Sequence, residues 1–359
     1  MSAVGTGGVL LRQEIGEQPA ILAATIHELM EPARTAASVM RRSDTSLAVL
    51  VGRGSSANAT QYGRYLLEVL TGLPVSIAAP SVVTMYGRVP NWKATALIAI
   101  SQSGQGDVVE VARAARDAGS LTLAVTNDAL SPLASTVELP LVTPAGIESS
   151  IPATKTYTSS LLALALLARA LVDDPGHAGL GDEQLAALPA AAGGVLEQEP
   201  AIASAARRLA DTGRCVVIGR GLNRSTAYEV ALKIQETAYL LAQAQGATDF
   251  LHGPLAVVDD GFRVIALLAG GPTAPAVIEA LRRARERGAR SLVICDGREA
   301  ASAARPLADD LIELETGLSE ALSPIGLSIA GQLLALHLAL ARGLSPERPR
   351  ALGKVTVTR

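Results

Sequence analysis

Residues 47–70 read LAVLVGRGSSANATQYGRYLLEVL, and residues 215–238 read CVVIGRGLNRSTAYEVALKIQETA. Both stretches start as an apolar run typical of a buried strand, continue with Gly-Arg-Gly, and lead through polar residues into a long helix pattern. A second pair, at 111–128 and 281–297, shares another plan: a helix, a glycine stop and an apolar strand ending on aspartate. Two copies of one strand–helix unit predict a duplicated α/β domain.

Strand and helix patterns alternate around these repeats, as in a doubly wound parallel sheet. A linker rich in Pro, Gly and acidic residues at 172–184 separates the two copies. We therefore expect domains at 1–180 and 181–345 and a C-terminal tail at 346–359. The second copy should run from a helix near 184–210 to a helix near 319–342. In the first copy, strands are expected near 47–52, 74–79, 95–100, 121–126 and 137–142, and helices near 11–42, 56–71, 107–118 and 155–173.

The composition excludes several classes of protein. Hydrophobic residues make up 49% of the chain and aromatic residues only 3%, which suits an α/β core of Ala, Leu, Val and Ile. The net charge is −3 and no basic run stands out, so no nucleic-acid partner is expected. Cys215 and Cys295 lie inside apolar runs and are predicted to be buried thiols, without the Cys/His spacing of a metal site.

No signal peptide is apparent, and the longest apolar stretch is taken to be 161–172. Arg169 interrupts this stretch, and it is too short to span a bilayer. We expect a cytoplasmic protein that does not enter a membrane.

Two turns combine glycine with small polar side chains: GRGSS at 52–56 and SQSG at 101–104. Glycines let backbone N–H groups approach an anion, hydroxyls add donors, and the following helix N-terminus favours negative charge. The alternative is that these residues only form turns and helix caps. Ligands of open α/β sheets bind beyond the carboxyl ends of the strands, so the turns after 47–52, 95–100 and 214–219 are expected on one rim. The candidate phosphate ligands are Gly54, Ser55, Ser56, Ser101, Gln102 and Ser103.

A third polar segment, IESSIPATKTYTSS at 147–160, opens a long apolar helix. Thr154 is expected to cap this helix and to offer its hydroxyl to the same anion. Lys155 either supplies charge to the site or is a solvated lysine in the first turn.

The second copy carries charged groups instead. Glu229, Lys233 and Glu236 recur at i, i+4 and i+7, which places them on one stripe of an otherwise apolar helix. The stripe is either a solvated face or the lining of a cleft, where a carboxylate can act as a general base. His252 precedes Gly-Pro in a loop before a strand and can exchange protons at neutral pH, whereas His337 lies in an apolar helix and is assigned to the core.

Eight motifs in this order resemble the double SIS (sugar isomerase) family, and the resemblance covers essentially the whole chain. They are LRQEIGEQP, GRGSS, AAPS, ISQSGQ, PATKTYT, EVALKIQET, LHGPLAV and RPRALGKVTVT. The chain is similar to the isomerase half of glucosamine-6-phosphate synthase (glutamine–fructose-6-phosphate aminotransferase) and to SIS-type glucosamine-6-phosphate deaminases. Its first turn looks closer to the deaminases, because the synthases usually carry Cys-Gly-Thr-Ser there.

The resemblance implies a fold of two tandem SIS domains, each a doubly wound, mostly parallel five-stranded sheet flanked by helices. It also implies a sugar phosphate as the ligand, no cofactor or metal, and a homodimer whose active site is shared between subunits. The turn residues, with Gln105 and Thr154, would bind the phosphate, and Glu236, beside Lys233, would move a proton between C1 and C2. His252, often supplied by the neighbouring subunit, would help to open the sugar ring. Lys354 reads as a solvated lysine from composition alone, but the resemblance implies that it meets the sugar carbonyl while the tail closes as a lid.

Four positions depart from the family pattern: Gly106, Ala153, Gln243 and Asp249 stand where Ser or Thr, Ser, and two glutamates are usual. They leave the identity of the amino sugar open. The favoured reading is a deaminase/isomerase that acts on glucosamine 6-phosphate. The rival, a glutamine-dependent synthase, needs a glutaminase domain with a cysteine after Met1, where this chain has Ser2. A non-catalytic phosphosugar sensor is a third reading, which would not need Glu236, His252 and Lys354.

Overall fold

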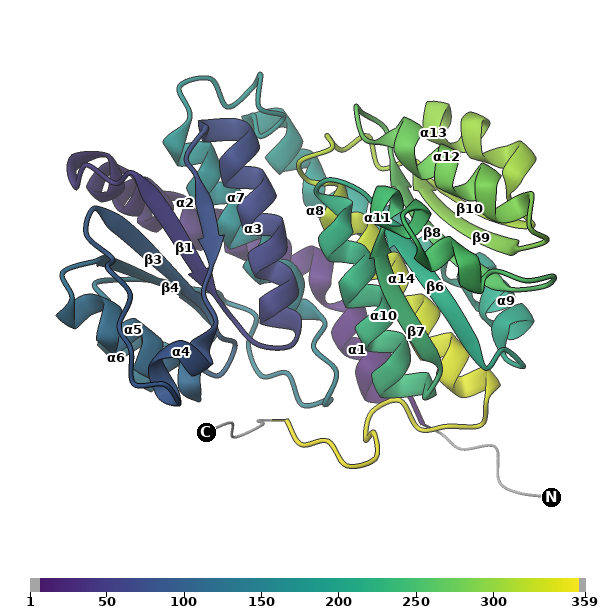
Figure 1. Ribbon diagram of the computed structural model, residues 1–359, viewed down its shortest axis with the longest axis horizontal. Coiled ribbons are helices and arrows are strands. Elements are labelled where there is room, and N and C mark those ends of the chain that lie inside the picture. Colours follow the sequence, from purple (N-terminus) through teal and green to yellow (C-terminus); the bar gives the residue numbers. More distant parts are fainter. Residues whose placement is uncertain (1–6, 355–359) are drawn as a thin grey trace. The chain divides into compact units, whose positions relative to one another are not determined.

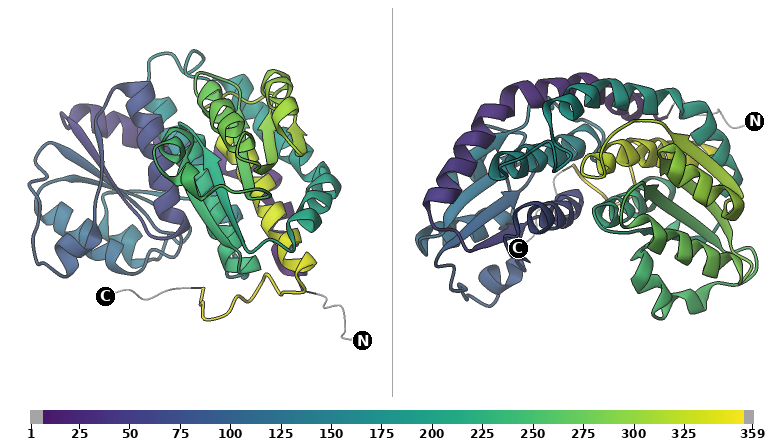
Figure 2. Two further views of the ribbon diagram at one scale, coloured as in Figure 1. Left: turned by 45° about the vertical axis from the view of Figure 1, so that its right-hand side comes forward. Right: turned by 90° about the horizontal axis from the view of Figure 1, so that it is seen from above.

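The computed structural model describes residues 7–354; Ser2 and positions 355–359 of the predicted tail lie outside the described residues. The described chain divides into two compact units (Figures 1 and 2). The first-sheet unit comprises 20–148, 155–186 and 353–354, and the second-sheet unit comprises 7–19, 149–154 and 187–352. Each unit is built on one sheet, so the α/β class predicted from the repeats is confirmed.

The first sheet has five parallel strands in the order β2-β1-β3-β4-β5. Its central strand β3 is buried along its whole length, which explains its unbroken aliphatic run. Helices α3 and α7 cover one face, and α4, α5 and α6 lie over the other (Figure 1). The strands are β1 (Leu47–Val51), β2 (Val75–Ile77), β3 (Thr95–Ile100), β4 (Leu121–Thr126) and β5 (Leu139–Val142); the helices are α2 (Gln18–Arg42), α3 (Ser55–Thr71), α4 (Pro80–Thr84), α5 (Asp107–Asp117), α6 (Pro132–Thr136) and α7 (Lys155–Leu171).

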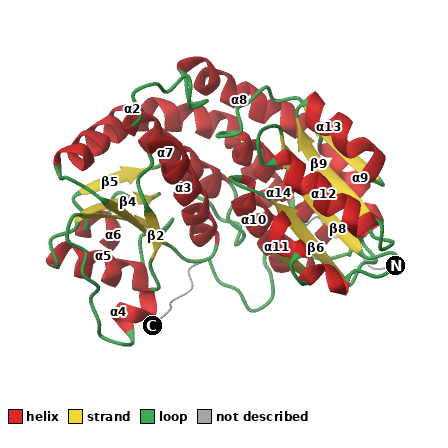
Figure 3. Cartoon of the chain, turned by 45° about the horizontal axis from the view of Figure 1, so that its top comes forward, coloured by secondary structure: helices red, strands yellow, loops and turns green. Residues whose placement is uncertain are grey.

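The second sheet repeats this order as β7-β6-β8-β9-β10, again with every pair parallel. Helices α10 and α14 pack on one side of β6, β8 and β9, and α12 and α13 on the other (Figure 3). The strands are β6 (Arg214–Gly219), β7 (Leu241–Gly246), β8 (Arg263–Ala269), β9 (Arg290–Asp296) and β10 (Asp310–Leu314); the helices are α1 (Val9–Gly16), α8 (Asp182–Glu197, shared between the units), α9 (Glu199–Leu209), α10 (Asn223–Ala238), α11 (Ala247–Leu251), η1 (Pro254–Val257, a 3-10 helix), α12 (Ala274–Arg285), α13 (Arg298–Ala304), η2 (Arg305–Leu307) and α14 (Ser323–Ala341).

The Gly-Arg-Gly turns follow the first strand of each sheet, and both glycines of each turn are structurally required. A Cβ at Gly52 would lie 2.7 Å from the carbonyl oxygen of Ser56, and a Cβ at Gly219 would overlap that of Asn223. The second glycines, Gly54 and Gly221, adopt φ values of +54° and +59°. The repeat is therefore a backbone device that brings the first turn of a helix close against the end of a strand.

Several boundaries differ from those expected. The helix predicted over 11–42 is two helices, which part at Glu17, the C-cap of α1, just before Pro19 in the first turn of α2. The helix predicted near 184–210 is likewise divided at Gln198, where Pro200 opens α9. The edge strand β7 and the short helices α4, α6 and α11 were not predicted.

The longest apolar helix is α14, and the assignment of that role to 161–172 was wrong. Among the described residues, α14 alone is long and apolar enough to cross a membrane. Of its most apolar window, 83% is buried inside the fold, where it packs on α9 and α10. Its composition is that of a core helix.

Candidate functional site

The first polar turn lies between β1 and α3. Gly54 is the N-cap of this 17-residue helix, and Ser55 and Ser56 occupy its first turn with partly exposed side chains. The backbone N–H of Ser56 donates to the carbonyl of Arg53 at 3.0 Å, which tightens the turn. Two hydroxyls are thus held at a helix N-terminus, where the helix dipole favours an anion.

The second polar turn follows β3 and is fixed at several points. The carbonyl of Gln102 accepts the N–H of Asn127 at 3.0 Å and the hydroxyl of Thr126 at 3.3 Å. Gly104 is buried with φ +59°, and a Cβ there would overlap the side chain of Ser131. The backbone is therefore held by β4 and its following turn. Ser101, Gln102 and Ser103 remain partly exposed, and Gln105 and Gly106 are exposed.

Arg53 joins these two turns. Its Nη2 lies 2.5 Å and its Nε 3.1 Å from Oδ2 of Asp107, the first residue of α5. The Asp107 side chain is only 2% exposed, whereas that of Arg53 is 52% exposed. The strands β1 and β3 are parallel neighbours, and the order in which successive strands are added to the sheet reverses between them. Both turns therefore lie at the switch point where α/β proteins bind ligands. The shared rim is confirmed for these two turns. It was wrong for the turn after 214–219, because β6 belongs to the other sheet.

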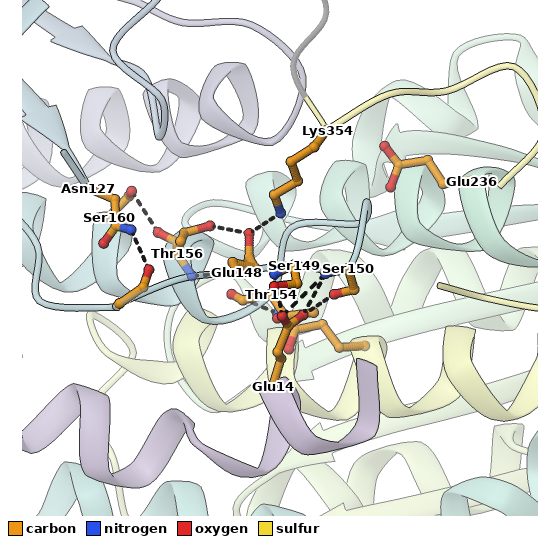
Figure 4. Close-up of polar contacts among 12 residues, drawn as sticks. Glu14, Asn127, Glu148, Ser149, Ser150, Thr154, Thr156, Ser160, Glu236 and Lys354 are labelled. Carbon is orange, nitrogen blue, oxygen red and sulfur yellow. Dashed lines mark hydrogen bonds and ion pairs between the residues drawn. The ribbon is translucent and has the colours of Figure 1, made fainter. Parts of the chain in front are cut away.

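A third polar group in the first-sheet unit is built on Glu148, which sequence reasoning did not single out. Its side chain is fully buried and accepts the Thr156 hydroxyl at 2.8 Å and the Thr156 N–H at 3.2 Å (Figure 4). Lys354 Nζ lies 2.7 Å from the same carboxylate. The composition-based reading of Lys354 as a solvated lysine is wrong. For Lys155 a solvated position was one of two alternatives, and this alternative is wrong because the residue is 4% exposed.

Thr154 belongs to the second-sheet unit, in the segment 149–154. It is 1% exposed, and its carbonyl accepts from the side-chain amide of Gln332 at 3.3 Å. The segment is fixed by the buried Glu14, whose carboxylate accepts the N–H groups of Ser149 at 2.5 Å and Ser150 at 3.2 Å, and the hydroxyl of Ser150 (Figure 4). Glu14 is the first of the two glutamates in the LRQEIGEQP motif, so that motif shapes this loop. The capping and anion-binding roles of Thr154 stay predictions.

The charged stripe of α10 is not a solvated face. Lys233 Nζ lies 3.4 Å from Glu229 and 2.6 Å from Glu236, and the side chains of Glu229, Lys233 and Glu236 are 1%, 3% and 20% exposed. A buried ammonium therefore stands between an interior carboxylate and a carboxylate that reaches solvent. Such a pair orients Glu236 and leaves it accessible, which is the arrangement a general base needs.

His252 is the C-cap of α11 and is exposed, in the short connection to η1 ahead of β8. The next residue, Gly253, has φ +137° and turns the chain away from the helix. Of the two departures nearby, Gln243 lies in β7, and Asp249 lies in α11 with its carboxylate 3.4 Å from Arg224.

The two cysteines and His337 lie in the interior or pack against neighbouring helices. Cys215 and Cys295 are buried, as predicted, and burial raises the pKa of each thiol to about 12. His337 is partly buried and lies 2.8 Å from Glu199 through Nε2. Within residues 7–354, the acidic, histidine and cysteine side chains form no group of three suited to a metal ion.

The SIS domain family model matches residues 43–170 and 208–342. A glutamine–fructose-6-phosphate aminotransferase (isomerizing) from Methanothermobacter thermautotrophicus is 33% identical over 347 residues, covering 96% of this chain and 57% of that protein. The chain thus spans little more than half the length of this relative.

Two solved structures share the fold. The C-terminal domain of glucosamine-fructose-6-phosphate aminotransferase from Francisella tularensis superposes with a TM-score of 0.84 at 25% identity, covering 95% of this chain and 98% of that one. A glucosamine-6-phosphate deaminase from Thermotoga maritima superposes with a TM-score of 0.72 at 21% identity, covering 97% and 99%. The second likeness concerns the fold alone.

Proposed function

This chain belongs to the SIS domain family, and we propose that it is a phosphosugar isomerase/deaminase that converts glucosamine 6-phosphate to fructose 6-phosphate and ammonia. In this proposal Ser55, Ser56, Ser101 and Ser103 hold the phosphate. Glu236 is the base, with Lys233 orienting it. The similarity to an isomerizing aminotransferase supports the substrate class, a six-carbon sugar phosphate.

The chemistry needs an anchored phosphate and one base beside C1 and C2. In the open-chain sugar, Glu236 removes the proton from C2, the electron pair forms a C1–C2 double bond, and the former carbonyl oxygen at C1 takes up a proton to give an enolamine. Return of the carbon-bound proton to C1, with loss of one proton from the nitrogen, leaves an imine at C2 and a hydroxymethyl group at C1. Water adds to the imine and ammonia leaves, which gives the ketone of fructose 6-phosphate. His252 would open the ring beforehand, and Lys354 would meet the carbonyl.

One observation carries the proposal: the charged stripe of Glu229, Lys233 and Glu236 on α10, in which the lysine forms ion pairs with both carboxylates. A solvated helix face would leave Lys233 in water, whereas here the ammonium is withdrawn between two carboxylates of unequal exposure. Burying a lysine is costly unless its charge is compensated, so a buried charged stripe that ends on an accessible carboxylate favours a functional site over a surface ion pair.

The similarity to aminotransferases favours a second candidate, the isomerase portion of a glutamine–fructose-6-phosphate aminotransferase. That portion carries out the same proton transfer in the opposite direction, on an imine formed from fructose 6-phosphate and ammonia. The two candidates differ in the source of nitrogen and in the favoured direction.

The test is to incubate the chain with a panel of amino-sugar 6-phosphates and to measure ammonia release and ketose phosphate formation. We expect turnover of glucosamine 6-phosphate. Formation of glucosamine 6-phosphate from fructose 6-phosphate and ammonia, without ammonia release from glucosamine 6-phosphate, would instead favour the isomerase portion of an aminotransferase. Tight binding of a sugar phosphate without turnover in either direction would contradict both and identify a sensor.

A further inference from the structure

Lys354 is held by a carboxylate that has no contact with water. The Glu148 side chain is fully buried, and its Oε2 lies 2.7 Å from Lys354 Nζ. The lysine side chain itself is 27% exposed. Truncating one partner of a buried ion pair leaves the other charge uncompensated in a medium of low dielectric constant, which is strongly unfavourable. The ion pair with Glu148 therefore fixes the position of the Lys354 ammonium.

Glu148 is itself fixed from the other side. Thr156, in the first turn of α7, donates its hydroxyl to Oε2 at 2.8 Å and its N–H to Oε1 at 3.2 Å. Fourteen of the 17 residues of α7 are buried, so this helix is a rigid support. Both carboxylate oxygens thus have fixed donors, and the position left for the ammonium is defined by the sheet unit rather than by the tail (Figure 4).

We propose that Glu148 is a positioning residue that sets the location and charge environment of Lys354, and that it acts on the sugar only through that lysine. The inference rests on the proposed function, in which Lys354 meets the sugar carbonyl. A lysine on a chain end has many rotamers, and a buried ion pair selects one of them before substrate arrives.

The expected consequence is kinetic. A catalytic group displaced by about 1 Å can cost about 10²-fold in rate. Glu148→Gln keeps the shape and can still accept the Thr156 hydroxyl, but it removes the charge that holds the ammonium. We expect kcat for glucosamine 6-phosphate to fall by about tenfold to a hundredfold, and KM to change by less than about threefold because the phosphate contacts are untouched.

A double-mutant cycle tests whether Glu148 acts through Lys354. In a Lys354→Met background, Glu148→Gln should cause no further fall in kcat. Ser160→Ala is the matched control, because it removes a buried hydroxyl of α7 that donates to the Thr156 carbonyl at 2.8 Å and does not contact Glu148. It should retain kcat within about threefold. Full kcat in Glu148→Gln, additive losses in the double variant, or an equal loss in Ser160→Ala would overturn the proposal.

A second measurement does not depend on activity. Trypsin must bind the free lysine side chain to cleave after Lys354, so the ion pair should protect that bond. Mass spectrometry under native conditions should find faster cleavage there in Glu148→Gln than in the wild-type chain. If the wild-type chain turns over no sugar phosphate, the proposed function fails. The cleavage rates then test only whether the ion pair holds Lys354. Equal rates in the wild-type chain and in Glu148→Gln would show that it does not.

Discussion

The turns after β1 and after β6 share the Gly-Arg-Gly sequence and a second glycine with positive φ, but their polar side chains have different surroundings. After β1, Ser55 and Ser56 are partly exposed. After β6, the polar side chains at the helix start form buried hydrogen bonds with other protein groups. Asn223 donates to Ser323 Oγ at 2.8 Å, and Thr226 donates to Asn223 Oδ1 at 3.0 Å. A polar group that is satisfied internally gains little from a ligand. The comparison teaches that one glycine framework can carry polar residues that are partly exposed in one copy and buried in the other.

The largest expected effect is on kcat, and it should distinguish the two carboxylates that flank Lys233. Glu236→Gln should lower kcat by about 10²–10⁴-fold, the range supplied by one general base. Glu229→Gln removes an equal charge beside the same lysine, but that carboxylate is 1% exposed and out of reach of a substrate. It should instead lower the free energy of unfolding. Ammonia-release kinetics and urea denaturation on both variants check this, and a fully active Glu236→Gln would refute the base assignment.

The hydroxyls of the first copy should show the next largest effect. A hydrogen bond to a charged group is worth about 1.5–3 kcal/mol, so Ser101→Ala and Ser103→Ala should each raise KM by about tenfold or more. Ser225→Ala in the second copy is the control. Its hydroxyl is buried and donates to the carbonyl of Leu222 at 2.7 Å. That variant should alter stability and leave KM unchanged. If all three variants gave the wild-type KM, the phosphate site would not lie at the second turn.

Much of this comparison was accessible from sequence, because strands and glycine turns are local features. The run TALIAI became β3 with the predicted limits, since every residue in it is buried. The edge strand β7 was missed because LAQAQG alternates small and polar residues and carries none of the β-branched residues that mark a strand.

The candidate site was harder to predict from the sequence, since burial of a charge depends on partners far away in the chain. Nothing near Glu148 indicates that its counter-ion is Lys354, which is 206 positions away. For the same reason the sequence could not decide whether Lys155 is solvated or belongs to the site. The α10 stripe was recognised because its i, i+4, i+7 spacing is local, but only the structure distinguished the buried members from the accessible one.

The glycines offer a test of the shared framework. Gly52→Ala and Gly219→Ala should both destabilise their units, because each new Cβ meets a carbonyl of the next helix turn. Crowding of this kind costs about 1–3 kcal/mol. The contact is closer at Gly219, so its variant should lose more stability in urea denaturation. Gly16→Ala, where a Cβ would meet nothing within 4 Å, is the control. Equal stabilities of all three variants would mean that the turns relax freely and that the repeat has no backbone requirement.

The smallest expected effect is on the free energy of unfolding at acid pH. Burial opposes ionisation of Glu199, but hydrogen bonds from Arg12 and His337 hold its pKa below the ordinary value of 4.5. The unfolded chain therefore binds this proton first as the pH falls, so the contribution is complete above about pH 4.5 and is lost as the pH falls through the folded-state pKa. The Arg12 side chain is 65% exposed, so the contribution should stay within about 1 kcal/mol. Glu199→Gln should flatten the acid limb of the unfolding free energy measured between pH 7 and pH 3. An unchanged slope would mean that the contacts of Glu199 with Arg12 and His337 contribute no measurable part of the acid sensitivity of the chain.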